Sequence, residues 1–168
     1  MRYSRNLLVE EIGERGQERL LRSSVLVVGA GGLGSPALLY LAAAGIGRIG
    51  VSDGDRVDVT NLNRQANHPA AAGGRRKTES AAVALKAFRP DLEPEAYGEH
   101  LTAENATALV RKCDAVVDGS DTFPSQYLCR DAAVALMNEG AFFTRPYGEL
   151  ASLVYDRAAG YTVALTRV

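Results

Sequence analysis

A glycine-rich turn between a predicted strand and a predicted helix narrows the folds available to this chain. Residues 25–28 are apolar and mostly β-branched, as in a central parallel strand. The turn Gly29-Ala-Gly31-Gly-Leu-Gly34 follows, and residues 35–44 form an alanine-rich helical stretch with Gly45 as its C-terminal cap. This order predicts a phosphate-binding turn in a βαβ unit. The turn alone fits NAD, FAD or ATP, and its glycines could also serve packing only.

The glycines and the next strand end have separate expected roles. Gly29 lets the chain turn sharply, Gly31 removes a side chain where backbone approaches phosphate, and Gly34 lets the helix lie close to the sheet. Asp53 ends the second predicted strand, where a carboxylate can accept hydrogen bonds from ribose hydroxyls. Asp53 therefore disfavours NADP but does not separate NAD from ATP.

Strand and helix patterns alternate along the rest of the chain. They predict a doubly wound, mostly parallel, Rossmann-like α/β sheet. We expect one nucleotide-binding domain over residues 1–168, with a helical N-terminal arm at 1–22 and a divergent C-terminal segment at 146–168. The predicted strands are 25–28, 49–52, 92–97, 115–117 and 141–144, the helices are 35–44, 78–88, 102–111 and 123–138, and a C-terminal hairpin joins 152–155 to 161–165.

Composition excludes several classes of protein. A 168-residue chain can bury roughly 70% of its unfolded surface, so it needs no disulfide or metal to fold. The net charge of −1 gives no basic footprint for nucleic acid. Residues 23–47 lack charge but contain several glycines and a proline, so no membrane span is expected. The charged N-terminus is no signal peptide, and Cys113 and Cys129 form no C-x-x-C pair, which favours a reducing, cytoplasmic location.

A polar loop after the second predicted strand favours ATP over a dinucleotide. The loop and the segments beyond it supply two cations, Arg64 and Lys77, and a carboxylate, Asp121, that follows the fourth predicted strand. The carboxyl ends of parallel strands line one crevice, where an arginine and a lysine can hold a triphosphate and an aspartate can hold Mg²⁺. This set fits nucleotidyl transfer better than hydride transfer.

Each polar residue taken alone also has a structural explanation. Arg64 could be a surface ion-pair partner, Lys77 a solvated lysine at a helix start, Asp121 the N-cap of the next helix, and Asp55 a turn residue. The functional interpretation rests on their joint placement.

The motifs of this chain resemble the ThiF/MoeB/HesA branch of the ubiquitin-activating-type superfamily. The resemblance covers about residues 2–145 and rests on RYSRN, GAGGLGSPALLYLAAAGIGRIGVSDGDRVDVTNLNRQ, GRRKTES and DGSDT. It implies a protein that uses ATP and Mg²⁺ to adenylate the C-terminal glycine of a small ubiquitin-like sulfur-carrier protein ending in Gly-Gly. It also implies a homodimer.

The resemblance assigns roles residue by residue. Asp53 would hold the ribose, Asp121 would bind Mg²⁺, and Arg5 would reach the nucleotide of the neighbouring subunit. The remaining residues implied to surround the nucleotide are Gly29, Gly31, Gly32 and Gly34 in the phosphate turn, Asn61, Arg64 and Lys77 at the phosphates, Gln65 beside them, and Asp55 in the same loop.

Three departures from the family pattern affect these expectations. The two cysteines cannot form the family's Cys₄ zinc site, so no zinc is expected, and both are expected to be buried thiols. Thr122 stands where the family more often has Asn, and the match grows loose over residues 142–156. The short chain is expected to be a natural short member, a truncated piece, or a homologue that binds nucleotide without adenylating.

Two alternatives to adenylation stay open from the sequence. A catalytically silent module would bind a nucleotide or a partner without turnover. An NAD- or FAD-dependent oxidoreductase would use the same glycine turn and Asp53. The sequence shows no His–Asp or Tyr–Lys catalytic pair for it, since His68 and His100 are the only histidines and both stand in polar surroundings.

Overall fold

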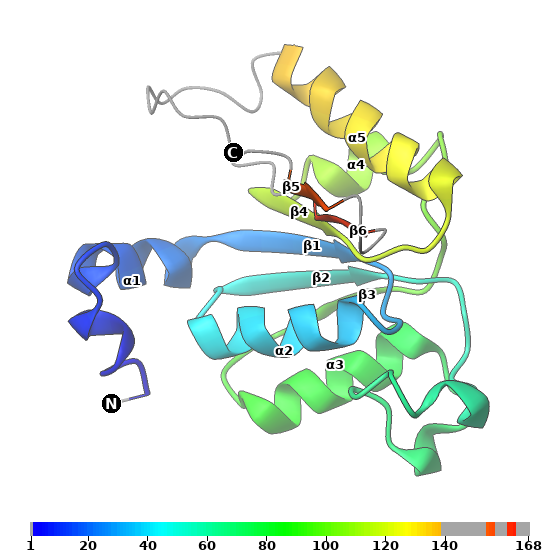
Figure 1. The fold of residues 1–168 in the computed structure, drawn as a ribbon, viewed down its shortest axis with the longest axis horizontal. Coiled ribbons are helices and arrows are strands. Elements are labelled where there is room, and N and C mark those ends of the chain that lie inside the picture. Colours follow the sequence, from blue (N-terminus) through cyan, green and yellow to red (C-terminus); the bar gives the residue numbers. More distant parts are fainter. Residues whose placement is uncertain (1, 139–153, 157–160, 164–168) are drawn as a thin grey trace.

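Four parallel strands form the sheet at the centre of the computed structural model, which describes residues 2–138, 154–156 and 161–163 (Figure 1). They are β1 (Ser24–Val28), β2 (Arg48–Ser52), β3 (Glu95–Tyr97) and β4 (Ala115–Asp118), in the spatial order β3-β2-β1-β4. β1 is central, and its Val27 lies opposite Val51 of β2 and Val117 of β4. The predicted parallel α/β fold is confirmed.

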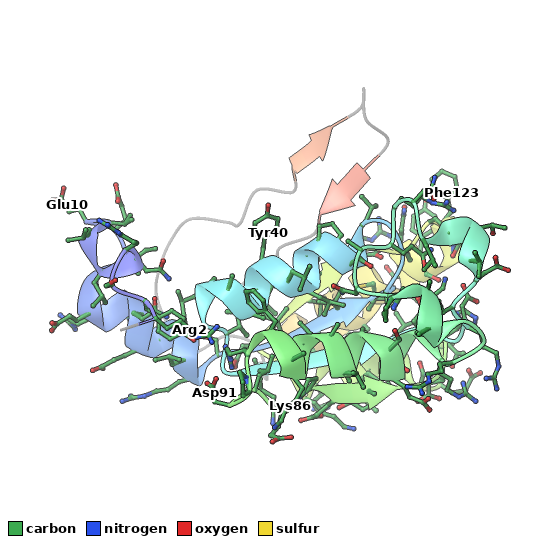
Figure 2. All side chains as sticks on the ribbon, turned by 90° about the horizontal axis from the view of Figure 1, so that it is seen from below. Arg2, Glu10, Tyr40, Lys86, Asp91 and Phe123 are labelled. Carbon is green, nitrogen blue, oxygen red and sulfur yellow. The ribbon has the colours of Figure 1, made fainter. Side chains whose placement is uncertain are left out.

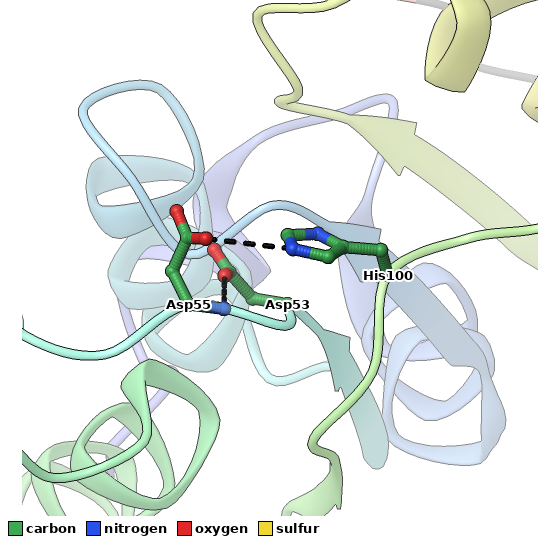
Figure 3. Close-up of side chains that lie close together, drawn as sticks. All are labelled: Asp53, Asp55 and His100. Atoms are coloured by element: carbon green, nitrogen blue, oxygen red, sulfur yellow. Dashed lines mark hydrogen bonds and ion pairs between the residues drawn. The ribbon is translucent and has the colours of Figure 1, made fainter.

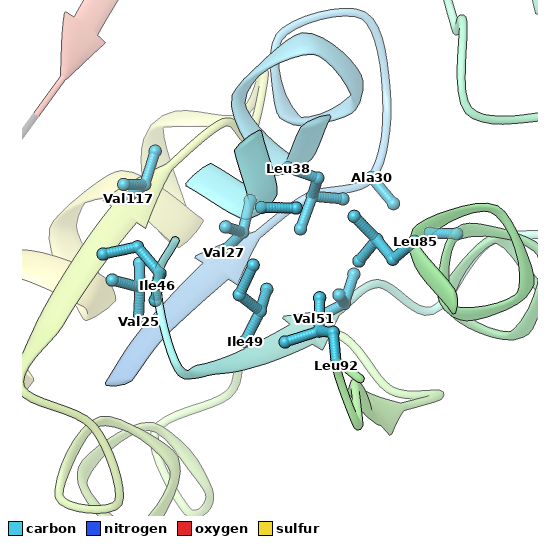
Figure 4. Close-up of a cluster of buried hydrophobic side chains, with 12 residues drawn as sticks. Val25, Val27, Ala30, Leu38, Ile46, Ile49, Val51, Leu85, Leu92 and Val117 are labelled. Carbon is cyan, nitrogen blue, oxygen red and sulfur yellow. The ribbon is translucent and has the colours of Figure 1, made fainter. Parts of the chain in front are cut away.

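Helices cover both faces of this sheet because alternate residues of β1 point in opposite directions. Val25 and Val27 pack with side chains of α2 (Gly34–Ala44) and α3 (Lys77–Phe88), in the cluster drawn in Figure 4. Leu26 and Val28 pack on the opposite face with α4 (Ala106–Val110) and α5 (Phe123–Asn138). The sheet is therefore doubly wound. The turn between β1 and α2 lies at the end of a strand that is buried on both faces.

The N-terminal arm docks on the C-terminal end of α2. It consists of the 3₁₀ turn η1 (Asn6–Leu8) and helix α1 (Gly13–Arg22). The side chains of Asn6 and Gln17 both donate to the carbonyl of Ala44, at 3.4 and 3.0 Å. Gly45 follows with φ 96°, a left-handed conformation that ends α2 as predicted.

Some element bounds differ from those predicted. The helix expected from Thr102 begins at Ala106, because Thr102 and Asn105 form a reciprocal pair of side chain to backbone hydrogen bonds that precedes the helix. The strand expected over 92–97 is shorter, because Leu92 is fully buried in the turn after α3. The loop between β2 and α3 also contains two short 3₁₀ turns, η2 (Val59–Asn61) and η3 (Ala70–Ala72).

The C-terminal predictions fall partly inside the described residues. β5 (Val154–Asp156) and β6 (Tyr161–Val163) pair antiparallel, as expected for the predicted hairpin. The strand predicted over 141–144 lies outside the described residues. Within the part of the chain that the structure describes, no helix combines the length and apolar character needed to cross a bilayer.

Candidate functional site

The main candidate site is a pocket of about 700 Å³ at the carboxyl ends of the strands. It lies where the turn after β1, the loop after β2 and the loop after β4 meet. Such ends are the usual ligand crevice of an open parallel sheet. Most of the predicted site residues line it, namely Gly29, Gly31, Gly32, Asp53, Asp55, Arg64, Gln65, Lys77 and Asp121.

Two glycines of the turn are required by close backbone packing. Gly29 has φ 89°, and a Cβ there would lie 2.8 Å from the carbonyl oxygen of Gly119. A Cβ on Gly34 would lie 1.7 Å from the carbonyl oxygen of Gly29. Gly119, in the loop after β4, completes the contact, since its own Cβ would lie 2.9 Å from the nitrogen of Gly34. Gly119 could not be singled out from the sequence, because its role depends on β4 being the neighbour of β1.

The other two glycines leave open space on the pocket side. Among the described residues, a Cβ on Gly31 would lie 3.7 Å from the Gln65 amide, and a Cβ on Gly32 would lie 3.5 Å from the Arg64 side chain. The N-terminus of α2 beside them has no side-chain cap and no acidic residue in its first turn. Its N–H groups and helix dipole can therefore accept an anion in the pocket.

Asp53 joins the end of β2 to the glycine turn. It is buried, and its Oδ2 accepts a hydrogen bond from the N–H of Ala30 at 2.7 Å while its Oδ1 accepts one from the N–H of Asp55 at 2.8 Å. Each carboxylate oxygen keeps a second lone pair for a ligand hydroxyl. The carboxylate thus fixes the turn and still faces the pocket.

Lys77 is buried in the pocket and pairs with Asp55. Its side chain is only 7% exposed, which contradicts the alternative of a solvated lysine at a helix start. The ammonium donates to Asp55 Oδ2 at 2.8 Å, and the N–H of Lys77 donates to the carbonyl of Asp55 at 3.0 Å. The hydrogen bond from Lys77 holds the pKa of Asp55 below its ordinary value.

His100 lies on the other side of Asp55 (Figure 3). Its Nε2 is 3.4 Å from Asp55 Oδ1, a contact between a histidine and an aspartate that was not apparent from the sequence. The sequence could have indicated this pair, because His100 follows the third predicted strand as Asp55 follows the second. What the sequence does not give is that β2 and β3 are neighbours.

Asp53, Asp55 and His100 also bring potential metal ligands together. One ligand atom from each lies within 4.8 Å of the others. Asp55 Oδ2 already accepts a hydrogen bond from the Lys77 ammonium, and each oxygen of Asp53 accepts one from a backbone N–H group. A divalent cation there would meet a buried positive charge, so this cluster is a poor cation site.

Arg64 is held at the pocket by amides. It donates to Asn61 Oδ1 at 2.7 Å and to Asn63 Oδ1 at 3.1 Å, and among the described residues no carboxylate pairs with it. The alternative of a surface ion pair is therefore wrong for the described part. Asn61 does not line the pocket and acts on it through Arg64. Gln65 is buried, and within the described residues its Oε1 has no hydrogen-bond partner.

Asp121 lies exposed on the pocket rim and does not cap α5. Thr122 has that role, because its Oγ1 accepts a hydrogen bond from the N–H of Ser125 at 3.4 Å and its carbonyl accepts one from Gln126 at 3.2 Å. The alternative N-cap role of Asp121 is wrong. Its carboxylate oxygens are suitable ligands for Mg²⁺.

Arg5 is not brought to the pocket within one chain. It is exposed in the N-terminal arm, next to Asn6, which contacts the C-terminal end of α2. The pocket lies at the opposite end of α2, where Leu33 lines it.

Both cysteines are buried away from the pocket lining. Burial raises the pKa of Cys113 to about 11 and that of Cys129 to about 12. The thiols therefore stay protonated near neutral pH, as expected for core residues and not for nucleophiles.

The sequence of this chain is similar to the sequences of known proteins. Residues 3–149 match the model of the ThiF family. The chain is 51% identical over 135 residues to a sulfur carrier protein adenylyltransferase of Thermus thermophilus, covering 80% of this chain and 50% of the relative. It is 47% identical over 133 residues to a probable adenylyltransferase/sulfurtransferase, MoeZ, of Mycobacterium tuberculosis, covering 79% of this chain and 34% of the relative. The chain thus spans half or less of these curated relatives.

The fold of this chain is also similar to the folds of solved structures. The E. coli tRNA N6-threonylcarbamoyladenosine dehydratase TcdA superimposes with a TM-score of 0.74 at 27% identity, covering 82% of this chain and 56% of that one. A structure of TcdA in complex with ATP gives a TM-score of 0.69 at 29% identity, covering 76% of this chain and 52% of that one.

Proposed function

The chain belongs to the ThiF family, and from this premise we propose that it binds ATP and transfers AMP to the C-terminal glycine of a ubiquitin-like sulfur-carrier protein. The observation that carries the proposal is the pocket itself. Buried Lys77 and amide-held Arg64 lie with the uncapped N-terminus of α2 between two carboxylates, Asp53 and Asp121. The names of the curated relatives and the ATP complex of TcdA support this assignment.

Each part of the pocket has a role in the proposed reaction. The N–H groups beside Gly31 and Gly32 bind phosphate oxygens, and Asp53 accepts hydrogen bonds from the ribose. The carboxylate of the carrier attacks the α-phosphorus, the bond to the β-phosphate oxygen breaks, and pyrophosphate leaves. Lys77 and Arg64 stabilise the negative charge that develops on the phosphates. Gln65 orients the nucleotide beside them.

Mg²⁺ fits the donor set at the rim of the pocket. We propose Asp121 as its protein ligand, because this carboxylate is exposed, lines the pocket and has no capping role. When bound, Mg²⁺ supplies further neutralisation of the triphosphate charge.

A homodimer would complete the site with Arg5. Helix α2 has no charged residue, and its exposed side chains are all uncharged: Leu33, Pro36, Tyr40 and Ala43. Tyr40 is 77% exposed and points away from the body of the protein (Figure 2). A helix without a charged face is normally buried, so a second copy is a suitable cover. Antiparallel pairing of two α2 helices, each about 16 Å long, would bring the arm of one copy towards the pocket of the other.

The proposed function can be tested by mass spectrometry of the carrier. The chain is incubated with ATP, Mg²⁺ and a sulfur carrier that ends in Gly-Gly. We expect one AMP group on the carrier's C-terminus, and none on a carrier that lacks its last glycine. ATP binding without the adduct would support the silent binding module instead.

A further inference from the structure

The ammonium of Lys77 has donors left over after its contact with Asp55. It is buried, and its only side-chain partner among the described residues is Asp55 Oδ2. A lysine ammonium has three N–H donors, so two remain for other acceptors in the pocket. An anion that binds in the pocket would therefore approach the Lys77 ammonium while that ammonium is still paired with the Asp55 carboxylate. The two anions would repel each other around one ammonium.

Asp55 has a second partner available in His100. Its other oxygen, Oδ1, faces His100 Nε2 at 3.4 Å, so one carboxylate spans the two side chains. His100 is exposed, and its imidazole can donate an N–H to this oxygen.

The backbone around His100 is built to hold it there. Ser52 Oγ donates to the carbonyl of Glu99 at 2.9 Å, and Asn105 Nδ2 donates to the carbonyl of His100 at 3.0 Å. Gly54 leaves the space that the imidazole uses, because a Cβ there would lie 2.3 Å from His100 Cδ2. Contacts from β2 and from the turn before α4 therefore hold the backbone that carries this ring beside Gly54.

We propose that Asp55 and a phosphate group compete for Lys77, and that His100 is the partner which Asp55 keeps when Lys77 turns to the phosphate. Asp55 and His100 are thus positioning residues that act through Lys77. This inference rests on the proposed function, because it assumes that a nucleotide phosphate enters the pocket. In this inference Asp55 does not bind the nucleotide. The negative charge of Asp55 instead weakens phosphate binding and favours release of pyrophosphate.

Calorimetric binding of inorganic pyrophosphate and of adenosine to the 168-residue chain tests the exchange. Asp55→Asn should tighten pyrophosphate binding about fivefold, which corresponds to the loss of one partly exposed ion pair, and should leave adenosine binding unchanged. Glu93→Gln is the matched control, because it breaks a lysine–carboxylate pair with Lys86 away from the pocket. Thermal unfolding of each variant verifies its fold.

The role of His100 is tested by a double-mutant cycle. His100→Ala should weaken pyrophosphate binding severalfold in the wild-type background and have no effect in the Asp55→Asn background. His100→Gln, which keeps an N–H donor, should restore part of the loss. A general field effect of the histidine would instead persist when Asp55 is Asn.

The outcomes separate this inference from the proposed function. Weaker or unchanged pyrophosphate binding by Asp55→Asn overturns the exchange, as does a His100→Ala effect that survives in the double mutant. Competition for Lys77 without any AMP adduct on a carrier counts against the proposed adenylation alone. A wild-type chain that binds neither pyrophosphate nor ATP overturns both.

Discussion

The glycines of the β1–α2 turn differ in what they do. Gly34 and Gly29 are fixed by backbone contacts, whereas Gly31 adjoins open space in the pocket. Sequence spacing correctly selected the turn. It also assigned a packing role to Gly34 and a phosphate-facing role to Gly31, but it could not predict the contact of Gly29 with Gly119, which lies in a loop far along the chain.

Alanine substitutions should separate these two roles. Gly34→Ala should destabilise the fold by about 3 kcal/mol or more, because its Cβ would overlap the Gly29 carbonyl. Gly31→Ala should change the free energy of unfolding by less than about 1 kcal/mol but weaken ATP binding. Denaturant unfolding and calorimetry measure the two effects. Equal destabilisation by both variants would contradict the assignment.

The pH dependence of stability should report on Asp118. Burial raises the pKa of this carboxyl in the folded protein, although Ser120 donates two hydrogen bonds to it. A raised pKa contributes stability at low pH that is lost as the pH rises through the folded value. Asp118→Asn should therefore gain stability relative to wild type between the ordinary aspartate pKa and neutral pH. A difference in unfolding free energy that stays constant across this range would contradict the account.

Side-chain hydrogen bonds decide where helices α4 and α5 begin. The sequence predicted α5 over 123–138, and the structure confirms it. The alternative that Asp121 caps this helix is wrong, since Thr122 caps it; both residues are good cap types, and only the backbone path decides between them. The start of α4 was placed too early for a related reason, since Thr102 and Asn105 bond each other before the helix begins.

Removing the cap of α5 should have a measurable effect on stability. Thr122→Ala should lower the free energy of unfolding by about 1 kcal/mol, because the N–H of Ser125 loses its acceptor. Thr122→Asn keeps a capping oxygen and should stay close to wild type. Equal loss in both variants, measured by denaturant unfolding, would show that the hydroxyl does not cap the helix.

At the scale of the whole molecule, the order of strands in the sheet decides which site residues could be placed together from the sequence. Strand ends in a parallel sheet meet at one edge, so the glycine turn, Asp53 and Asp121 could be placed together from sequence. His100 could be placed at the same edge, because it follows the third predicted strand, but its contact with Asp55 could not be predicted, since that contact requires β3 beside β2. Arg5 could be assigned only from the family resemblance, and in one chain it lies at the far end of α2.

The exposed face of α2 yields a prediction about assembly. Tyr40→Arg should shift the protein towards monomer in analytical ultracentrifugation, because it places charge in the middle of the uncharged face. It should also lower adenylation, since Arg5 would no longer reach a second pocket. Lys86→Glu, at a half-buried position of α3, is a charge-changing control that should leave the mass unchanged. A wild-type protein that is already monomeric and active would contradict the proposed role of Arg5.

ATP–pyrophosphate exchange tests the central claim most directly. The chain is supplied with Mg²⁺, ATP and labelled pyrophosphate, with and without a sulfur carrier that ends in Gly-Gly. We expect label to enter ATP only when the intact carrier is present. We also expect Lys77→Met to reduce the rate of exchange at least about 100-fold, because the positive charge that stabilises the phosphates is lost. Absence of exchange with several such carriers, in a protein that remains folded and binds ATP, would contradict the central claim.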